Sequence, residues 1–320
     1  MIMPYASPLI QLPRLGAHLK LDLWAKRDDL LPLSGGGNKA RKMWRIAELV
    51  ETRQCNAIVT TGGIQSNHAR AAALLAAQKG WKCKLILHSA EALNSPPTGN
   101  LLLMQLTGAE IEVVSPEQIS ESMKCAMEEL RFRGYAPYEI PGGGHCIAGG
   151  LAYVEAIDEL NQQLHSIDWF PEHIVLASGT GTTQAGIVVG LENLGIAAQV
   201  HGISVARKNP RGSNVLSEMC SELRMHLGLT SSETRVRSNF WDNWIGDGYE
   251  RASKKVLETI RLASRLEGLI LDPTYTGKAF TGLIALVEQK EIPPGSKVLF
   301  WHTGGLLNLM ASRYSFAKSV

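Results

Sequence analysis

Short runs of apolar residues alternate along the chain with segments in which apolar residues recur every three or four positions. The runs are rich in Val, Ile and Leu, and they predict strands at 57–61, 82–87, 110–114, 173–177, 199–204 and 297–301. Helical spacing is found between them, for example in 40–50 and 72–79. This alternation predicts a mainly parallel sheet with helices on both faces. Ligands of such sheets lie beyond the carboxyl ends of the strands, in the loops that lead into helices.

Glycine clusters indicate how the chain is divided into domains. They lie at 35–37, 62–63, 142–144 and 304–305. The three strand–helix units between the first and third clusters are enough for a small domain inserted within a larger one. We therefore expect an α/β protein of two three-layer domains with open, mainly parallel sheets: a small domain at 43–148 and a large domain formed by 1–42 and 149–320.

Composition and charge narrow the class of protein. Of the 320 residues, 45% are hydrophobic and 19% are charged, so the chain can bury a full core and is not disordered as a whole. A net charge of +2 with no basic run of five or more argues against nucleic acid as the main partner. The five cysteines form no C-x-x-C pair, which disfavours a disulfide framework and a structural zinc site, and we expect no bound metal.

Targeting signals are not evident in the sequence. The first residues, 1–12, carry two prolines and lack the charged region of a signal peptide, and the uncharged stretch 173–191 is interrupted by serine, threonine and glutamine. We therefore expect no membrane span, and the cysteine usage predicts the reducing cytoplasm.

One glycine-rich loop has the composition of a phosphate site. It follows the strand at 173–177, opens a helix at 184–194 and consists of Ser178, Gly179, Thr180, Gly181, Thr182 and Thr183. Glycines let the backbone approach an anion closely, and the N–H groups at a helix start point toward it. The next glycine is Gly186, so the G-x-G-x-x-G spacing of a dinucleotide site fails, and no Walker A, H-E-x-x-H or G-x-S-x-G motif occurs. We favour a cradle for one phosphate over an ordinary turn with threonine caps.

A second glycine-rich loop, 34–42, places Lys39 at the predicted start of a helix. The positive helix dipole, with Arg41 and Lys42 nearby, is expected to lower the pKa of this lysine and free its amine as a nucleophile that forms Schiff bases. The alternative is a solvated surface lysine, which is the commoner situation for this residue type.

Three further strand-end loops carry polar side chains: Ser66, Asn67 and His68; Tyr275 and Thr276; and Thr303. Ser66 or Asn67 either caps the following helix or faces the cleft. An isolated His68 is more typical of a helix surface or a satisfied interior than of a catalyst. The loop position of Tyr275 favours an acid–base role over simple packing.

One phosphate cradle, one activated lysine and several neutral hydrogen-bonding loops match what a pyridoxal phosphate site requires. The sequence resembles the fold-type II pyridoxal phosphate enzymes, which have a tryptophan synthase β-like fold. Within them it is similar to the group of 1-aminocyclopropane-1-carboxylate deaminase and D-cysteine desulfhydrase. The resemblance covers nearly the whole chain and rests on five motifs in order: GGNKARK (36–42), GGIQSNHAR (62–70), ASGTGTTQAG (177–186), LDPTYTGKA (271–279) and HTGG (302–305).

The resemblance implies a role for each matching position. Lys39 would hold pyridoxal 5′-phosphate covalently, Asn67 would hydrogen-bond its 3′ oxygen, and the loop 178–183 would hold its phosphate. Thr276 and Thr303 would lie at the pyridine nitrogen. The substrate, a small amino acid, would be surrounded by Ser66, Asn67, His68, His145, Tyr249 and Tyr275, and the catalytic residues would be Lys39, Ser66, Tyr249 and Tyr275. The resemblance also implies a homodimer.

The residues at two positions distinguish the deaminases of this group from the desulfhydrases. The deaminase pattern has Y-E-G-K and H-L-G-G, with a glutamate at the pyridine nitrogen, whereas this chain has Thr276 and Thr303. A carboxylate keeps that nitrogen protonated and makes the ring a strong electron sink, which opening a cyclopropane requires. Loss of a thiolate requires a weaker electron sink. We therefore predict a β-elimination lyase that converts D-cysteine, or a related β-substituted alanine, to pyruvate, ammonia and hydrogen sulfide. Lys39, or less simply Ser66, would take the α-proton, and Tyr275 would protonate the thiolate.

One departure leaves the substrate open. Desulfhydrases of this type tend to carry Gly-Gly-Ser-Asn where this chain has two glycines followed by His145 and Cys146. His145 either adds a positive or hydrogen-bonding group near the substrate, as a sulfonate would need, or makes no contact. The alternatives are a 1-aminocyclopropane-1-carboxylate deaminase, an L-cysteate sulfo-lyase, a non-catalytic protein that binds the cofactor or an amino acid, and a phosphate-binding α/β protein.

Overall fold

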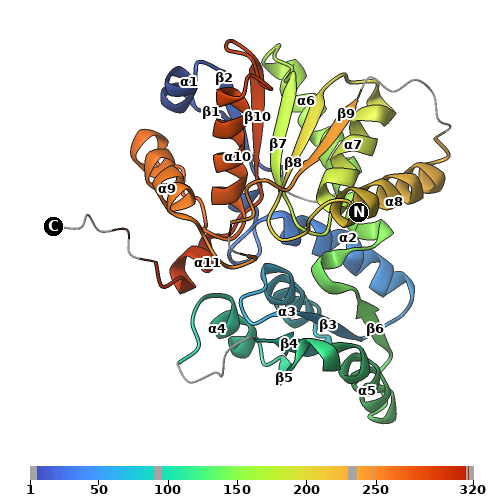
Figure 1. The fold of residues 1–320 in the computed structure, drawn as a ribbon. Coiled ribbons are helices and arrows are strands. Elements are labelled where there is room, and N and C mark those ends of the chain that lie inside the picture. The colour runs from blue at the N-terminus through green and yellow to red at the C-terminus, as the bar shows by residue number, and fades with distance from the viewer. Residues whose placement is uncertain (1–5, 90–95, 230–235, 247, 315, 317–320) are drawn as a thin grey trace.

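Two mainly parallel sheets organise the computed structural model, which describes residues 6–89, 96–229, 236–246, 248–314 and 316 (Figure 1). The larger sheet has the strand order β1-β2-β10-β7-β8-β9, in which β1 runs antiparallel to β2. Its strands are β1 (Leu9–Gln11), β2 (Asp22–Arg27), β7 (His173–Ser178), β8 (Gln199–Ser204), β9 (Arg237–Trp241) and β10 (Lys297–His302). The smaller sheet is parallel throughout and has the order β5-β4-β3-β6, formed by β3 (Ala57–Gly63), β4 (Lys82–His88), β5 (Glu110–Val114) and β6 (Pro137–Ile140).

Helices cover each sheet. They are α1 (Pro13–Leu19), α2 (Asn38–Thr52), α3 (Asn67–Lys79), α4 (Gly99–Leu106), α5 (Ile119–Phe132), α6 (Ile147–Ser166), α7 (Thr182–Leu194), α8 (Arg211–Leu227), α9 (Lys254–Glu267), α10 (Thr276–Glu288) and α11 (Leu306–Ala311), with 3-10 turns η1 (Asp28–Leu30), η2 (Pro116–Gln118) and η3 (Gly142–Gly144). Figure 1 shows α6, α7 and α8 on one side of the larger sheet and α1, α9 and α10 on the other. This layering confirms the predicted α/β fold class. Among the described residues, no helix combines the length and apolarity that crossing a membrane requires.

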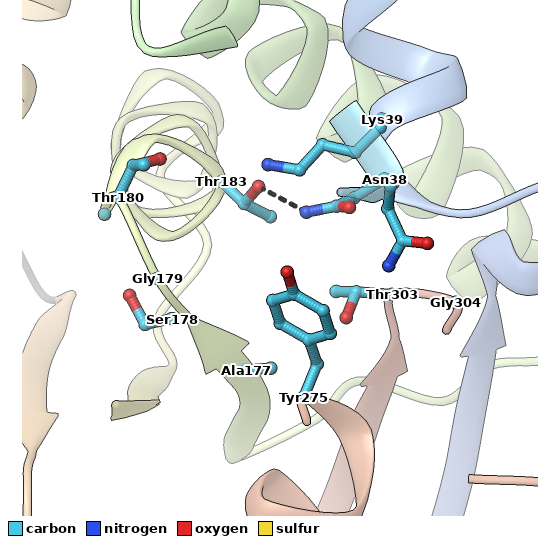
Figure 2. Close-up of a pocket in the computed structure, with 12 residues that line it drawn as sticks. Asn38, Lys39, Ala177, Ser178, Gly179, Thr180, Thr183, Tyr275, Thr303 and Gly304 are labelled. Carbon is cyan, nitrogen blue, oxygen red and sulfur yellow. Dashed lines mark hydrogen bonds between the residues drawn. The ribbon is translucent and has the colours of Figure 1, made fainter. Parts of the chain in front are cut away.

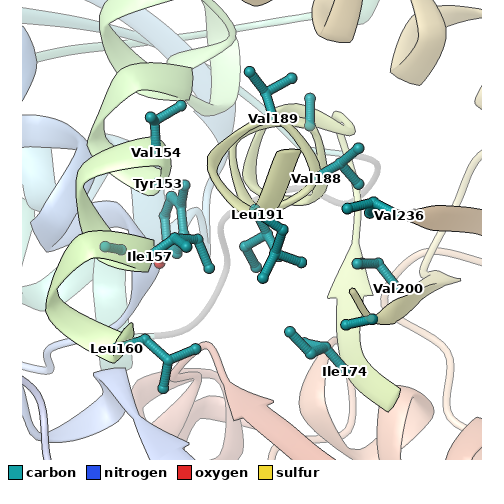
Figure 3. Packing of buried hydrophobic residues seen from close by; sticks show 14 of the residues in the cluster. Tyr153, Val154, Ile157, Leu160, Ile174, Val188, Val189, Leu191, Val200 and Val236 are labelled. Atoms are coloured by element: carbon teal, nitrogen blue, oxygen red, sulfur yellow. The ribbon is translucent and has the colours of Figure 1, made fainter. Parts of the chain in front are cut away.

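Successive residues of β7 pack into two different cores. Ile174 and Leu176 lie in the cluster formed with α6, α7 and α8 (Figure 3), whereas Val175 and Ala177 lie in the cluster formed with α1, α9 and α10. Neighbouring side chains of a strand point to opposite faces, so a strand covered on both sides is apolar at most positions. This explains why the apolar runs of central strands such as β7 and β10 predicted them correctly.

Four strands were not predicted because their sequences are short or polar. The strand β2 contains Lys26 and Arg27, β9 begins with Arg237, and β6 begins with Pro137. Lys26 is nevertheless fully buried, since its amine donates to Ser7 O at 2.7 Å and to Gln163 Oε1 at 2.6 Å and also pairs with Glu159. Two of these partners, Glu159 and Gln163, lie far from Lys26 in the sequence, so no local pattern predicts that this lysine is buried.

The helix α2 connects the regions of the two sheets and carries Lys39 in its first turn. It begins at Asn38 and packs against both α3 and α6. All strands of the smaller sheet lie within 57–140, which supports a small domain at 43–148, although the exact division stays a prediction.

Candidate active site

A pocket lies where the carboxyl ends of β7 and β10 face the first turns of α2 and α3 (Figure 2). Its described lining consists of Asn38, Lys39, Asn67, Ala177, Ser178, Gly179, Thr180, Gly181, Thr183, Tyr275, Thr303 and Gly304. Most of the residues singled out in the sequence are therefore brought together. Six of them are not part of this lining: Ser66, His68, His145, Thr182, Tyr249 and Thr276.

The amine of Lys39 is held at the pocket by the loop that follows β6 and contains η3. Its Nζ donates a hydrogen bond to Gly143 O at 2.9 Å. Burial lowers the pKa of Lys39 to about 8. The sequence analysis predicted a lowered pKa but attributed it to the helix dipole and to Arg41 and Lys42, whereas the cause is burial. Arg41 is bound elsewhere, to Asp28 at 2.9 Å and to Glu159 at 2.7 Å.

Asn38 connects α2 to two other loops of the pocket and was missed in the sequence. Its side-chain Nδ2 donates to Thr183 Oγ1 at 3.1 Å (Figure 2), and its backbone N–H donates to Thr303 O at 3.0 Å. These contacts fix Lys39 relative to the loops after β7 and β10. The signal for this role was its place beside the lysine in the glycine-rich motif.

The loop between β7 and α7 forms a cradle with unused hydrogen-bond donors. Gly181 adopts a φ of +80°, which an L side chain rarely takes, and α7 begins directly after it. Ser178 Oγ is buried and has no hydrogen-bond partner among the described residues. The same holds for Lys42 Nζ, whose pKa lies well below its ordinary value because of burial and the neighbouring Lys39. Buried donors without partners are costly, and an anion in the pocket would satisfy the Ser178 hydroxyl, whereas Lys42 is not part of the pocket lining.

Asn67 presents donors to the pocket, whereas Ser66 caps the helix. Ser66 Oγ accepts from Ala69 N at 3.2 Å, which is the N-cap alternative raised by the sequence. The Asn67 Oδ1 accepts from Asn100 Nδ2 at 3.0 Å. With its oxygen engaged in this way, the amide nitrogen of Asn67 can donate to an acceptor in the pocket.

His68 turns into the small domain and away from the pocket lining. Its Nε2 lies 2.8 Å from Thr60 Oγ1, and that hydroxyl donates to Ile140 O at 2.7 Å, so Nε2 carries the proton. The side chain is 2% exposed, and its pKa lies well below the ordinary value because of burial and the nearby Lys39 and Lys42. His68 is therefore a neutral interior residue.

Two tyrosines meet at the mouth of the pocket. The hydroxyls of Tyr249 and Tyr275 are hydrogen-bonded, and their rings are nearly perpendicular with centroids 5.8 Å apart. Burial raises the pKa of Tyr249 to about 12 and that of Tyr275 well above its usual value. Both hydroxyls therefore hold their protons at neutral pH. Figure 2 shows the Tyr275 hydroxyl pointing into the pocket from the start of α10.

Thr303 lines the pocket, whereas the Thr276 hydroxyl is hydrogen-bonded to Asp272. Thr276 Oγ1 donates to Asp272 Oδ1 at 2.8 Å and accepts from the backbone N–H of Asp272 at 2.9 Å. The carboxylate of Asp272 also accepts from the backbone N–H groups of Thr274, Tyr275 and Thr276. Asp272 thus shapes the loop that presents Tyr275, a role that its sequence position did not reveal. The predicted contact of Thr276 with a pyridine nitrogen stays a prediction.

His145 contacts the phosphate-loop helix. Its Nδ1 lies 2.6 Å from Thr182 Oγ1. Burial, followed by the positive charges of Lys42, Arg207 and Lys39, lowers its pKa to about 4. His145 is therefore neutral at neutral pH and does not supply the positive charge considered from the sequence.

Comparison with known proteins agrees with this geometry. Residues 4–304 match the family described as pyridoxal-phosphate dependent enzyme. The chain belongs to this family. It is 34% identical over 312 residues to a D-cysteine desulfhydrase of Klebsiella pneumoniae strain 342, covering 95% of this chain and 93% of that protein. It is 36% identical over 308 residues to a putative 1-aminocyclopropane-1-carboxylate deaminase of Pyrococcus furiosus, covering 95% and 91%.

A solved structure supports the same assignment. The crystal structure of an ACC deaminase homologue has a TM-score of 0.86 and 32% identity, and the match covers 97% of this chain and 92% of that one. The chain is thus a pyridoxal phosphate-dependent lyase of the group that contains these relatives, and its fold is that of the fold-type II enzymes.

The residues present fit the cofactor. The glycine-rich cradle and the unpartnered Ser178 hydroxyl suit its phosphate, and the half-buried Lys39 amine suits its aldehyde. Thr303 and the Asn67 amide provide neutral partners for its ring.

Proposed function

We propose that this chain eliminates the β-substituent of D-cysteine or a related β-substituted alanine. With D-cysteine, one substrate molecule and one water yield pyruvate, ammonia and hydrogen sulfide. The proposal draws on the Klebsiella relative, which is a D-cysteine desulfhydrase, and on the chemistry of the pocket lining.

One observation carries the choice of reaction: the described lining of the pocket contains no aspartate or glutamate. The carboxylate of Asp272 is nearby, but its oxygens accept hydrogen bonds from three backbone N–H groups and from Thr276. Thr303 is left as the neutral partner for the pyridine nitrogen. A neutral ring withdraws electrons less strongly, which suffices for loss of a thiolate and disfavours the opening of a cyclopropane.

The cofactor supplies an electron sink for the carbanion that forms at the substrate α-carbon. Lys39 would hold the cofactor, and with substrate in the pocket its amine would take the α-proton. A pKa of about 8 suits this task, since about a quarter of such amines are neutral at pH 7.5. Its hydrogen bond to Gly143 O shows that the amine can be held by the loop above the pocket.

Tyr275 protonates the departing sulfur. Its hydroxyl lines the pocket and keeps its proton at neutral pH, because burial raises its pKa well above the usual value. Tyr249 is hydrogen-bonded to the Tyr275 hydroxyl and positions it, and the proton that Lys39 takes from the α-carbon balances the one that Tyr275 gives up. The amide nitrogen of Asn67, whose oxygen accepts from Asn100, would donate to the cofactor and orient its ring.

Ring opening of 1-aminocyclopropane-1-carboxylate is the second candidate. The Pyrococcus relative and the ACC deaminase homologue favour it through their similarity over nearly the whole chain. It requires a protonated pyridine nitrogen, for which the described lining offers no carboxylate.

A substrate panel tests the proposal. The holoenzyme is incubated with D-cysteine, L-cysteine, cysteate and 1-aminocyclopropane-1-carboxylate, and the keto acids are separated as hydrazones. We expect pyruvate and sulfide from D-cysteine and no 2-oxobutanoate. Lys39→Ala should abolish turnover, whereas Lys79→Ala, which removes a surface amine paired with Glu51, should not. Formation of 2-oxobutanoate as the main product, or full activity of Lys39→Ala, would contradict the proposal.

A further inference from the structure

The loop at which this chain departs from the desulfhydrase pattern rests on the phosphate cradle. Lys39 Nζ is bonded to Gly143 O, and a Cβ at Gly143 would lie 2.8 Å from Thr180 Cγ2. His145 follows two residues later and reaches Thr182, the first residue of α7. This small-domain loop therefore contacts the cradle of the large sheet at two points.

Three groups form a hydrogen-bonded chain that ends in the pocket. His145 Nδ1 lies 2.6 Å from Thr182 Oγ1, and Thr182 Oγ1 lies 3.2 Å from Thr180 Oγ1. Thr182 is fully buried, whereas Thr180 lines the pocket. The Thr182 hydroxyl has a single proton, so it can donate to at most one of these neighbours, and where it does so it accepts from the other.

The direction of these hydrogen bonds decides whether the Thr180 hydroxyl can donate to a ligand in the pocket or only accept from it. If His145 donates to Thr182, then Thr182 donates to Thr180, and the Thr180 proton is free for a ligand. If His145 accepts, the Thr180 proton is used by Thr182, and Thr180 presents only lone pairs. A phosphate dianion accepts hydrogen bonds and cannot donate them, so its binding selects the first direction.

We propose that His145 is a positioning residue for the cofactor phosphate: its Nδ1–H sets the Thr182 and Thr180 hydroxyls so that Thr180 donates to the phosphate. Burial, together with the side chains of Lys42, Arg207 and Lys39 that face it, keeps the His145 imidazole neutral, with one N–H to give. His145 thus contributes to holding the cofactor and not to recognising the substrate. This role does not depend on which amino acid is converted.

Cofactor affinity tests the inference without any turnover. Apoenzyme is titrated with pyridoxal 5′-phosphate and, separately, with pyridoxal, which lacks the phosphate, and binding is followed by visible absorbance. His145→Ser should raise the Kd for pyridoxal 5′-phosphate about tenfold, which corresponds to the loss of one hydrogen bond, and leave the Kd for pyridoxal unchanged. Thr182→Val should have a similar effect, and the double variant should be no weaker than either single variant.

Two further variants separate positioning from loss of structure. His145→Asn, whose amide can donate in place of Nδ1–H, should bind close to wild-type affinity, and His226→Ser on the exposed face of α8 should be unaffected. An unchanged Kd in His145→Ser, additive losses in the double variant, or equal weakening of both ligands would overturn the inference. A raised KM for D-cysteine with an unchanged cofactor Kd would instead make His145 a substrate residue.

Discussion

Replacing Asp28 by asparagine would remove the charge at the centre of a buried network behind the pocket. Asp28 lies in η1 and is fully buried. It accepts hydrogen bonds from Arg41 Nη2 at 2.9 Å, from Tyr153 Oη at 2.5 Å and from Trp301 Nε1 at 2.8 Å. One carboxylate therefore joins α2, which carries Lys39, to α6 and to β10.

The pKa of Asp28 sets a lower limit on the effect. Burial alone would raise this pKa, but Arg41, together with Lys26 and Tyr153, outweighs burial and lowers it from 3.8 to about 2. The fall from 3.8 to about 2 corresponds to roughly 2–3 kcal/mol of stability at neutral pH. Breaking a buried ion pair typically costs about 3–5 kcal/mol, because the partner charge stays buried. We therefore expect a loss of about 2–5 kcal/mol.

Thermal unfolding of the variant measures this loss. At about 2 °C per kcal/mol for a chain of this length, the Tm of Asp28→Asn should fall by about 4–10 °C at pH 7. Because the folded-state pKa is depressed, the contribution is present above pH 4 and is lost as the pH falls through about 2. The gap in stability between wild type and variant should accordingly narrow by about 1 kcal/mol between pH 7 and pH 3.

An exposed ion pair provides the control for this measurement. Glu258→Gln breaks the pair between Lys254 and Glu258 on α9, both of which are exposed, and should change the Tm by less than about 2 °C. If Asp28→Asn destabilises the protein no more than Glu258→Gln, the network behind the pocket does not hold α2 in the way we infer.

Three other predictions concern the pocket itself. The rate at which apoenzyme captures pyridoxal 5′-phosphate on Lys39 should rise with pH around a midpoint of about 8, and a midpoint near the ordinary 10.5 would rule out the neutral amine. Tyr275→Phe should lower kcat about 10²-fold or more with little change in cofactor Kd, and unchanged kcat would exclude it as the proton donor. Gly304→Ala, with a Cβ 2.8 Å from Gly37 Cα, should lower the Tm more than Gly295→Ala, which has a similar positive φ but open space; equal effects would show that close packing against α2 is unimportant.

The fold was largely predictable because its central strands are buried on both faces. Most side chains of such a strand are apolar, and this local property can be recognised without knowing the partners. The strands β2 and β9 lie toward the edges and carry charged residues, so their hydrogen-bonded neighbours decide their conformation. Lys26 in β2 is tolerated because Glu159 and Gln163, on α6, and Ser7 O reach its amine.

The position of the candidate site was predictable for a topological reason. Parallel strands bring their carboxyl ends to one edge, so the loops after β7 and β10 had to meet. What the sequence could not give is the direction of individual side chains. His68 and Thr276 belong to the motifs that form the site, but their side chains are hydrogen-bonded to Thr60 and Asp272. Asn38 gains its importance from Thr183, which lies 145 residues away.

The lowered pKa of Lys39 shows where local reasoning stops. A helix dipole acts within one turn and is weakened by solvent, whereas the amine of Lys39 is desolvated by groups from distant parts of the chain. Gly143 accepts its hydrogen bond, and the loops bearing Thr180 and Tyr275 form the same pocket. A peptide containing the α2 motif alone would bury none of this amine and would titrate near the ordinary value. The reactivity of the lysine is therefore a property of the assembled loops around both sheets, and a change in the loop at His145 can alter it without touching α2.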